Sequence, residues 1–254
     1  MDQEHRIAVV SGASRGIGRA IALRLAEAGF AVWALARSDH ELKKLVLVAK
    51  GSVRPLHADV SRPEEIIQAC IRILAEGGTP EVLVNNAGIP LSAPLQKTEL
   101  DAYEQLMAVN VRAAFLFCRE LLPRMAERRS GRVINIASTA GLKGFRYTAA
   151  YCASKHALVG LTRALAAEFA ERNVAINAVC PGWTDTDMLA RAVEAIAKST
   201  GRSPAEAREA LQNMNPMHRL IRPEDVAELV AFLASDAATS ITGSIYPIDA
   251  GELV

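Results

Sequence analysis

Short β-branched runs alternate with longer segments of helical period along the chain, and this alternation constrains the fold more than any other feature. The runs are Ile7–Val10, Ala31–Ala36, Val53–His57, Val82–Val84, Val133–Ala137, Ala175–Val179 and Ile245–Ile248. Such alternation predicts βαβ units with right-handed crossovers, and nearly continuous apolar runs predict strands buried on both faces. We therefore expect an α/β fold in which a doubly wound parallel sheet of about seven strands carries helices on both faces.

No repeat, low-complexity tract or Pro/Gly/Ser-rich linker divides the sequence, so we interpret residues 1–254 as a single domain. Segment 186–220 departs from the regular alternation. Within it, Ser203 and Pro204 are typical of a helix start, and Glu206 completes a capping box. Two helices inserted here would lie above the carboxyl ends of the strands, where ligands bind in such sheets. The segment is therefore interpreted as a helical lid over a substrate site.

Composition argues against several classes of function. Lys and Arg (29) nearly balance Asp and Glu (28), so no overall field would attract nucleic acid or an anionic membrane. No apolar run approaches the roughly 18 residues of a membrane span, and no secretory signal is recognisable. The four cysteines lie far apart, which favours reduced thiols over disulfides or a metal site. We expect a soluble, cytoplasmic protein without a metal.

The stretch Val9–Gly18, VVSGASRGIG, is compatible with two kinds of site. The letters GASRG fit G-x-S-x-G, in which Ser14 would be the nucleophile of a hydrolase. That enzyme needs an acid and a histidine further along the chain, and no histidine lies in an evident strand-end loop with an acid. In the other interpretation, Gly12 allows a tight turn, and Gly16 and Gly18 let phosphate and the next helix approach closely. The phosphate-binding turn is favoured.

Six short motifs follow one another in order. They are Ser11–Gly18, Asn85-Asn86-Ala87-Gly88, Asn110, Ser138, Tyr151-x-x-x-Lys155 and Pro181-Gly182. Together they resemble the short-chain dehydrogenase/reductase family, and the resemblance covers essentially the whole chain. It implies a Rossmann-type sheet, a nicotinamide cofactor and, usually, a homotetramer.

A proton donor must lie beside the carbonyl that receives hydride, and Tyr151 is the candidate. Lys155 follows four residues later in a helical segment, so the two side chains share one face. A nearby ammonium stabilises a phenolate and lowers a phenol pKa that starts at roughly 10. Ser138, at a strand end, can hydrogen-bond the substrate oxygen. The resemblance implies that Asn110 anchors a water and that Lys155 holds the nicotinamide ribose. Taken alone, the Tyr–Lys pair also fits an ordinary amphipathic helix.

The end of the second strand bears on the choice of nicotinamide. Family members that use NAD carry an acid there to receive the ribose hydroxyls, whereas this chain has Ala36 followed by Arg37. Arg15 is a second cation near the same corner. Guanidinium groups bind phosphate well, so we predict NADP(H) in preference to NAD(H). The alternative is that both arginines are solvated surface charges.

The resemblance assigns further residues to the cofactor. Those of the glycine turn are Gly12, Ser14, Arg15, Gly16, Ile17 and Gly18. Asp59 and Val60 frame the adenine, and Asn86, Ala87 and Gly88 line the adenosine ribose side. The remaining positions, toward the nicotinamide, are Tyr151, Lys155, Pro181, Gly182, Thr184 and Thr186.

Within the family, the sequence resembles 3-oxoacyl thioester reductases and aromatic polyketide ketoreductases. The apolar lid residues fit either an acyl or ring pocket or simply the inner faces of two helices; they are Met188, Leu189, Val193, Ile196, Leu211, Met214 and Met217. Positively charged side chains of the lid, such as Arg208, would either contact the phosphates of an acyl carrier or lie on a solvated helix face.

Two alternative functions remain open. One is an enzyme that acts on a free cyclic or secondary alcohol or ketone and uses NAD or NADP, and the other is a non-catalytic subunit. His218 and Ala250 replace frequent glycines, and we expect Ala250 in a strand.

Overall fold

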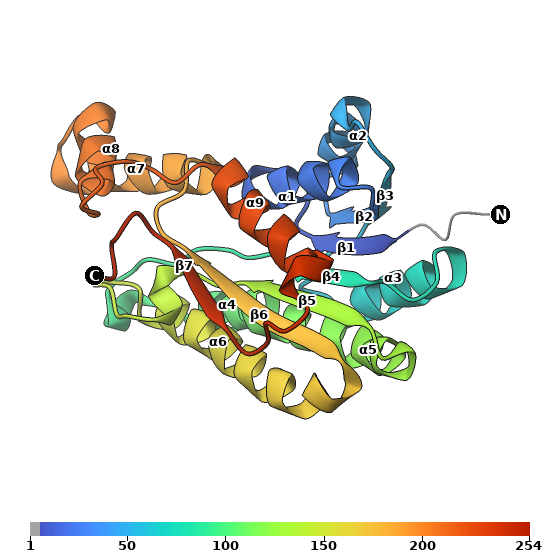
Figure 1. The fold of residues 1–254 in the computed structure, drawn as a ribbon. Coiled ribbons are helices and arrows are strands. Elements are labelled where there is room, and N and C mark those ends of the chain that lie inside the picture. The colour runs from blue at the N-terminus through green and yellow to red at the C-terminus, as the bar shows by residue number, and fades with distance from the viewer. Residues whose placement is uncertain (1–5) are drawn as a thin grey trace.

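The computed structural model describes residues 6–254 and contains one sheet of seven parallel strands in the order β3-β2-β1-β4-β5-β6-β7 (Figure 1). The strands are β1 (Ile7–Ser11), β2 (Ala31–Ala36), β3 (Val53–His57), β4 (Val82–Asn85), β5 (Gly131–Ile136), β6 (Val174–Pro181) and β7 (Ile245–Ile248). The predicted α/β fold is confirmed, and every predicted strand lies within two residues of its observed bounds. The order reverses direction between β1 and β4, which marks the usual ligand-binding point of such sheets.

Helices cover both faces of the sheet (Figure 1). One face carries α1 (Gly16–Glu27), α2 (Asp39–Val48) and α9 (Pro223–Ala234). The other carries α3 (Pro63–Glu76), α4 (Leu100–Met107), α5 (Ala113–Arg128) and α6 (Ala149–Phe169). Short helical turns are η1 (Leu95–Lys97), η2 (Ala108–Arg112), η3 (Thr139–Gly141), η4 (Ala170–Arg172) and η5 (Asp236–Ala238).

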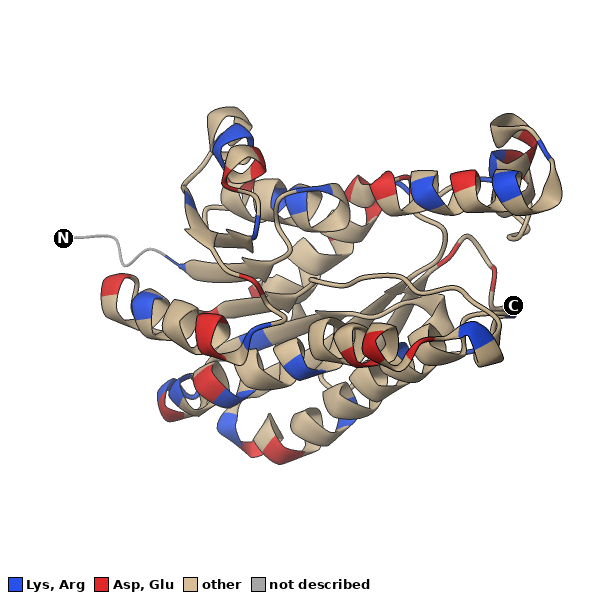
Figure 2. Cartoon of the chain, turned by 180° about the vertical axis from the view of Figure 1, so that it is seen from behind, with Lys and Arg blue, Asp and Glu red and all other residues tan. Residues whose placement is uncertain are grey.

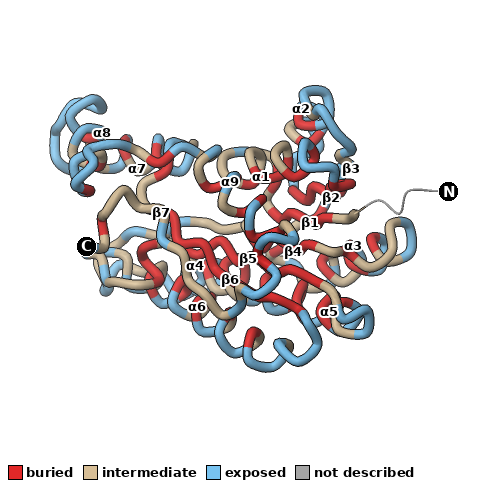
Figure 3. The backbone as a smooth tube through the Cα atoms, in the orientation of Figure 1, coloured by how far each residue is buried: buried red, intermediate tan, exposed pale blue. Residues whose placement is uncertain are grey.

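The core lies on both sides of the central strands, which Figure 3 shows as buried along most of their length. Successive residues of β1 demonstrate this arrangement. Val10 packs in a cluster with Leu25 of α1 and Val230 of α9, whereas Val9 packs in a second cluster with Phe117 of α5. Because neighbouring side chains of a strand point to opposite faces, a strand between two helical layers must be apolar throughout. Basic and acidic residues are interspersed over the outer helices (Figure 2).

Two further helices, α7 (Asp187–Thr200) and α8 (Pro204–Gln212), project beyond the carboxyl ends of the strands (Figure 1). The predicted capping box is present, with Ser203 Oγ accepting from the Glu206 amide and the Glu206 carboxylate accepting from the Ser203 amide. Leu189, Val193 and Leu211 are buried in a cluster shared by the two helices. These three residues therefore form the inner faces of the helix pair.

The three lid methionines behave differently from that cluster. Met188, Met214 and Met217 are 38%, 43% and 55% exposed. Arg208, a candidate phosphate contact, instead lies 2.6 Å from Asp185 and joins α8 to the segment before α7. The lid thus has a packed apolar interior and flexible thioether side chains on its surface.

His218 and Ala250, which stand where related sequences often have glycine, both adopt backbone conformations that favour glycine. His218 has φ 48° and Ala250 has φ 54°, both in the left-handed region where glycine is strain-free. The prediction that Ala250 continues a strand is wrong, because β7 ends at Ile248 and Ala250 begins a turn with Gly251 at φ 86°. The turn redirects the C-terminal residues toward the strand ends.

Candidate active site

The glycine turn joins β1 to α1 with almost no room for side chains. Gly12 and Gly16 have φ 67° and 54°. A Cβ on Gly12 would lie 2.9 Å from Ala87 Cα, and one on Gly18 would collide with the Gly12 carbonyl oxygen and the Asn86 side chain. Gly12 and Gly16 must be glycine because their backbones have positive φ angles. Gly12 and Gly18 must be glycine because a Cβ would collide with neighbouring atoms. The N-terminus of α1 is left open toward an anion.

Hydrogen bonds fasten this turn to the end of β4. Asn86 Nδ2 donates to the Ser11 and Gly12 carbonyl oxygens at 3.0 and 3.2 Å. Ser11 Oγ accepts from the Asn86 and Ala87 amides at 3.0 and 3.1 Å. Sequence reasoning did not single out Ser11, although it is the first letter of the first motif. Ser14 is half-buried, and no hydrogen bond joins it to a histidine or acid within residues 6–254.

The two arginines lie on the surface at the β1–β2 side of the turn. Arg15 is the N-cap residue of α1, and Arg37 directly follows β2; both are exposed. Arg37 Nη1 lies 4.0 Å from Asp59 Oδ2. Burial acts to raise the pKa of Asp59, but hydrogen bonds from Ser61 and the charge of Arg37 leave it lower than usual. Asp59 is thus ionised and near Arg37, and Val60 beside it is buried.

The proposed proton donor lies at the start of α6. Ser138 follows β5, and its Oγ accepts from the Ala140 amide at 3.1 Å. Burial raises the pKa of Tyr151 to about 12, although a hydrogen bond with Ser138 acts against this shift. Lys155 Nζ donates to the Ile136 carbonyl oxygen at 2.9 Å and lies 5.8 Å from the Tyr151 ring centre. The three side chains meet at the carboxyl end of β5.

In the protein without cofactor, the Tyr151 pKa lies above its usual value, and the predicted lowering by Lys155 together with an oxidised nicotinamide stays a prediction. Desolvation has the largest effect on both groups, because it penalises the charged form of each. Burial lowers the pKa of Lys155 to about 8 while that of Tyr151 rises. Lys155 therefore keeps its charge below about pH 8, and the Tyr151 phenol is protonated at neutral pH. A protonated phenol is the state needed to donate a proton to a carbonyl oxygen.

Asn110 lies in a π-helical turn, η2, between α4 and α5. Its Oδ1 accepts from the Ile89 amide at 2.8 Å, and its Nδ2 donates to the Ile89 carbonyl oxygen at 3.0 Å and to Ser154 Oγ at 3.1 Å. Ser154 Oγ in turn donates to the Tyr151 carbonyl oxygen at 2.7 Å. Asn110 therefore connects the segment after β4 to the first turn of α6. A π-turn inserts one extra residue and is frequent at functional sites.

A buried polar ladder fastens the middle of α6 to the sheet. Asn85 Nδ2 donates to Asn135 Oδ1, and Asn135 Nδ2 donates to Thr162 Oγ1, both at 2.8 Å. Thr162 lies two turns after Lys155 on α6. Breaking such buried hydrogen bonds leaves unpaired polar groups, so the ladder favours one arrangement, although Asn85 Oδ1 itself has no hydrogen-bond partner within residues 6–254. The ladder sets the height of Tyr151 and Lys155 above the strand ends.

The remaining predicted residues lie at the same edge of the sheet. Gly88 packs against the catalytic candidates, since its Cβ position lies 3.5 Å from both Asn110 Oδ1 and Lys155 Nζ. Pro181 ends β6. Thr184 Oγ1 donates to the Gly182 carbonyl oxygen at 3.0 Å. Thr186 contacts the glycine turn near Gly16. Ile17 packs on the apolar core beside α1, and Ala87 packs between the ends of β1 and β4.

Sequence reasoning missed Ser154, Lys143 and Glu252. The only signal for Ser154 is its position between Tyr151 and Lys155. Glu252 carries a weaker signal, an acid within the C-terminal segment. Within residues 6–254, no helix is long and apolar enough to cross a membrane, and no group of three His, Cys, Asp or Glu residues could hold a metal ion.

The chain is similar over nearly its whole length to several known proteins. A family model described as "Enoyl-(Acyl carrier protein) reductase" matches residues 12–252. A 3-oxoacyl-(acyl-carrier-protein) reductase of Thermotoga maritima is 33% identical over 257 residues, covering 100% of both chains. A D-beta-hydroxybutyrate dehydrogenase of Cupriavidus necator is 34% identical over 250 residues, or 97% of each chain. The solved structure of an actinorhodin polyketide ketoreductase with NADPH has a TM-score of 0.95 and 33% identity, covering 99% of each chain.

We predict that Gly18→Ala destabilises the protein by about 1–3 kcal/mol, because the added methyl group must displace backbone or Asn86. Gly160→Ala is the matched control. Gly160 lies within α6 with nothing within 4 Å of its Cβ position, so alanine should stabilise by about 0.5–1 kcal/mol. Urea unfolding of both variants measures the difference. Equal effects at the two positions would contradict the close packing of α1 on the turn.

Proposed function

The chain belongs to the short-chain dehydrogenase/reductase family of oxidoreductases, and on that premise we propose that it reduces 3-oxoacyl thioesters to 3-hydroxyacyl thioesters with NADPH. The observation that carries the proposal is the meeting of Ser138, Tyr151 and Lys155 at the carboxyl end of β5, with Asn110 connected to the same helix turn through Ser154. A structural or regulatory subunit would have no physical need for this set.

The residues present fit an NADP(H) cofactor. The glycine turn carries no side chains at Gly12, Gly16 and Gly18 that would cover the start of α1, and a helix N-terminus favours phosphate. Arg15 and Arg37 would hold the 2′-phosphate, with Asp59 and Val60 nearby at the adenine. Along the rest of the cofactor we assign Ser14, Gly16, Ile17, Asn86, Ala87, Gly88, Tyr151, Lys155, Pro181, Gly182, Thr184 and Thr186. When bound, the nicotinamide supplies the hydride.

The side chains divide the remaining work between them. Ser138 Oγ donates a hydrogen bond to the substrate carbonyl oxygen and stabilises the negative charge that develops there. Tyr151 gives its phenolic proton to the same oxygen and so completes the secondary alcohol. The Lys155 ammonium, charged below about pH 8, stabilises the phenolate that remains. Asn110 holds the segment after β4 against α6 and keeps the Tyr151–Lys155 turn in place.

Relatives that act on a 3-oxoacyl group support the choice of an acyl thioester, and the exposed lid methionines suit an apolar acyl or ring substrate. The hydroxybutyrate dehydrogenase relative favours a second candidate, a free secondary alcohol or cyclic ketone, with NAD or NADP as cofactor. Lid residues 186–220 would cover the substrate in either case.

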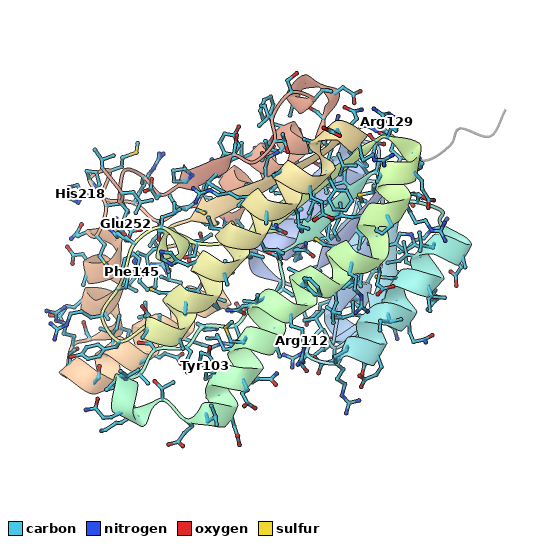
Figure 4. The ribbon with its side chains drawn as sticks, turned by 90° about the horizontal axis from the view of Figure 1, so that it is seen from below. Tyr103, Arg112, Arg129, Phe145, His218 and Glu252 are labelled. Atoms are coloured by element: carbon cyan, nitrogen blue, oxygen red, sulfur yellow. The ribbon has the colours of Figure 1, made fainter. Side chains whose placement is uncertain are left out.

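A homotetramer is part of the proposal. Leu100, Tyr103 and Phe115, on α4 and α5, are 66%, 39% and 48% exposed, and Figure 4 shows Tyr103 at the outer side of this helical layer. Large apolar side chains on an outer helical face are typical of self-association. Light scattering of the purified protein measures the number of subunits.

The substrate assignment is tested by following NADPH and NADH oxidation separately. The substrates are acetoacetyl-CoA, a longer 3-oxoacyl-CoA and a cyclic ketone. We expect fastest oxidation of NADPH with the thioesters. Turnover of the cyclic ketone alone would favour the second candidate, and no turnover of any ketone would contradict reductase function for this chain.

We predict that Tyr151→Phe lowers kcat about 10³-fold, because the proton donor is removed while the ring is kept. NADPH binding, followed by tryptophan fluorescence, should weaken far less than kcat falls, because the other assigned cofactor contacts remain. The control is Tyr147→Phe, since Tyr147 is 55% exposed and contacts only Arg146 through its hydroxyl. Its kcat should stay within about twofold of wild type. A similar loss in both variants would contradict the assignment of Tyr151.

We predict that Arg37→Asp raises the KM for NADPH about 10–100-fold and lowers that for NADH, because a charge-assisted contact is lost and an acid for the ribose hydroxyls is gained. Arg72→Ala is the control, since Arg72 is half-exposed and pairs with Glu76 on α3. Steady-state kinetics with each cofactor measures the change. An unaltered cofactor preference would show that Arg37 is a solvated charge.

A further inference from the structure

Glu252 is a buried carboxylate outside the set described above. Its side chain is 2% exposed, and Oε1 has no hydrogen-bond partner within residues 6–254. Its Oε2 lies 2.9 Å from the Cβ position of Gly182, at the end of β6. A buried acid with an unpaired oxygen carries a desolvation cost that an apolar residue would avoid. A chain that keeps such a group at the edge of a reaction site gains something other than stability.

The partner of Glu252 comes from the segment that begins with Ser138. Lys143 Nζ donates to the Glu252 carbonyl oxygen at 2.9 Å and lies 3.8 Å from Oε1, too far for a hydrogen bond but close enough for an ion pair. The ammonium also lies 5.0 Å from the Phe145 ring centre. Figure 4 shows Glu252 and Phe145 at the same end of the molecule, near His218 of the lid.

The C-terminal turn aims Glu252 inward. Asp249 accepts from the Gly251 and Leu253 amides at 3.0 and 2.9 Å, and the left-handed Ala250 and Gly251 reverse the chain. Gly251 packs against Pro216 at the end of the lid, whose Cγ lies 2.7 Å from the Gly251 Cβ position. One short tail thus contacts the lid, the segment after β5 and the end of β6.

We propose that Glu252 is a positioning residue for ketone reduction: paired with Lys143, its carboxylate holds the segment after Ser138 against Gly182 and the end of the lid. The inference rests on the proposed function, because it assigns Glu252 to the same reaction site. Glu252 acts through Ser138 and the lid, and it does not touch the reacting atoms. Losing its charge should loosen the segment that orients the carbonyl-binding serine.

The electrostatics of the site give this inference a distinctive pH dependence. The charged groups that face the carboxyl are Lys143, from the segment after β5, and Asp249, from its own tail; Gly182 and Pro216 bring no charge. Burial raises the pKa of Glu252 and the charge of Asp249 adds to this shift, whereas the charge of Lys143 and a hydrogen bond from the Thr139 side chain act against it. As pH falls through that raised pKa, the carboxyl takes up a proton and the pair with Lys143 is lost. Activity should therefore fall on the acid side.

Stability should move in the opposite direction. A carboxyl whose pKa is higher in the folded than in the unfolded protein binds its proton more readily when folded, so stability rises as pH falls through the folded pKa. In its ionised form the group lowers stability. Glu252→Gln keeps the shape without the charge, so its thermal midpoint at neutral pH should equal or exceed that of wild type.

The test compares wild type, Glu252→Gln and Glu228→Gln as the pH is lowered from about pH 7.5 through the acid range, below the range in which Lys155 loses its charge. Glu228 is an exposed acid paired with Arg24, so its variant is the matched control. We expect Glu252→Gln to lower kcat about tenfold at pH 7.5 through misplacement of the Ser138 segment. Its activity should be flat over the range where wild type declines. Lys143→Met should show the same loss of kcat and the same flat pH profile as Glu252→Gln. The double variant should lose no more activity than either single variant, because both changes break the same pair.

The inference would be overturned if Glu252→Gln kept the wild-type kcat and the wild-type decline in acid. It would also be overturned if Glu252→Gln lost activity only because its thermal midpoint fell. Kinetics use whichever ketone the wild type reduces best, so failure on thioesters alone overturns only the substrate assignment. Without substrate, the thermal midpoint is compared over the same pH range. Identical profiles for wild type and Glu252→Gln would overturn the inference even if the proposed reaction is established.

Discussion

The contact between the start of α1 and the end of β4 is the constraint on which the rest of the site depends. Gly18 has no side chain because the Gly12 carbonyl oxygen and Asn86 occupy the space. Asn86 and Ser11 then satisfy the backbone groups that the turn leaves unpaired. Since β1 and β4 are neighbours where the sheet order reverses, closing this contact fixes both halves of the sheet relative to one helix N-terminus.

Helix α6, which carries Tyr151 and Lys155, is held in place by hydrogen bonds as well as by apolar packing. Hydrophobic packing holds α6 on the sheet without specifying its exact height, because apolar contacts are not directional. Hydrogen bonds supply the direction: Asn135 to Thr162 in the middle of the helix, and Asn110 to Ser154 in its first turns. Lys155 lies between these two attachments, and Tyr151 lies one turn before Ser154, which donates to its carbonyl oxygen. Their separation from the strand end is therefore set by paired polar groups whose loss would expose buried donors.

Buried ionisable groups at this edge of the sheet act against stability. Burial lowers the pKa of Lys155 to about 8 and raises those of Tyr151 and Glu252, so each group is held in a medium that disfavours its charge. For Tyr151 this favours the protonated form that a proton donor needs. Burial leaves Lys155 a charge that is lost above about pH 8, and it leaves Glu252 a carboxylate that takes up its proton more readily than an exposed glutamate does. Sites that combine such groups are typical of catalysis, since structure alone would favour apolar residues.

The sequence by itself determined the seven-stranded parallel sheet, the order of its elements and the positions of the glycine turn, because period and glycine placement are local properties of the chain. The family resemblance named Asn110, Ser138, Tyr151 and Lys155. Only the tertiary structure decided their environment. Desolvation by the folded chain raises the pKa of Tyr151 in the protein without cofactor, and the turn at Ala250 replaced a predicted strand. The pair Lys143–Glu252 joins residues 109 positions apart, which no local pattern encodes. Burial and cross-chain contacts depend on the whole fold, and so they become visible only once it is formed.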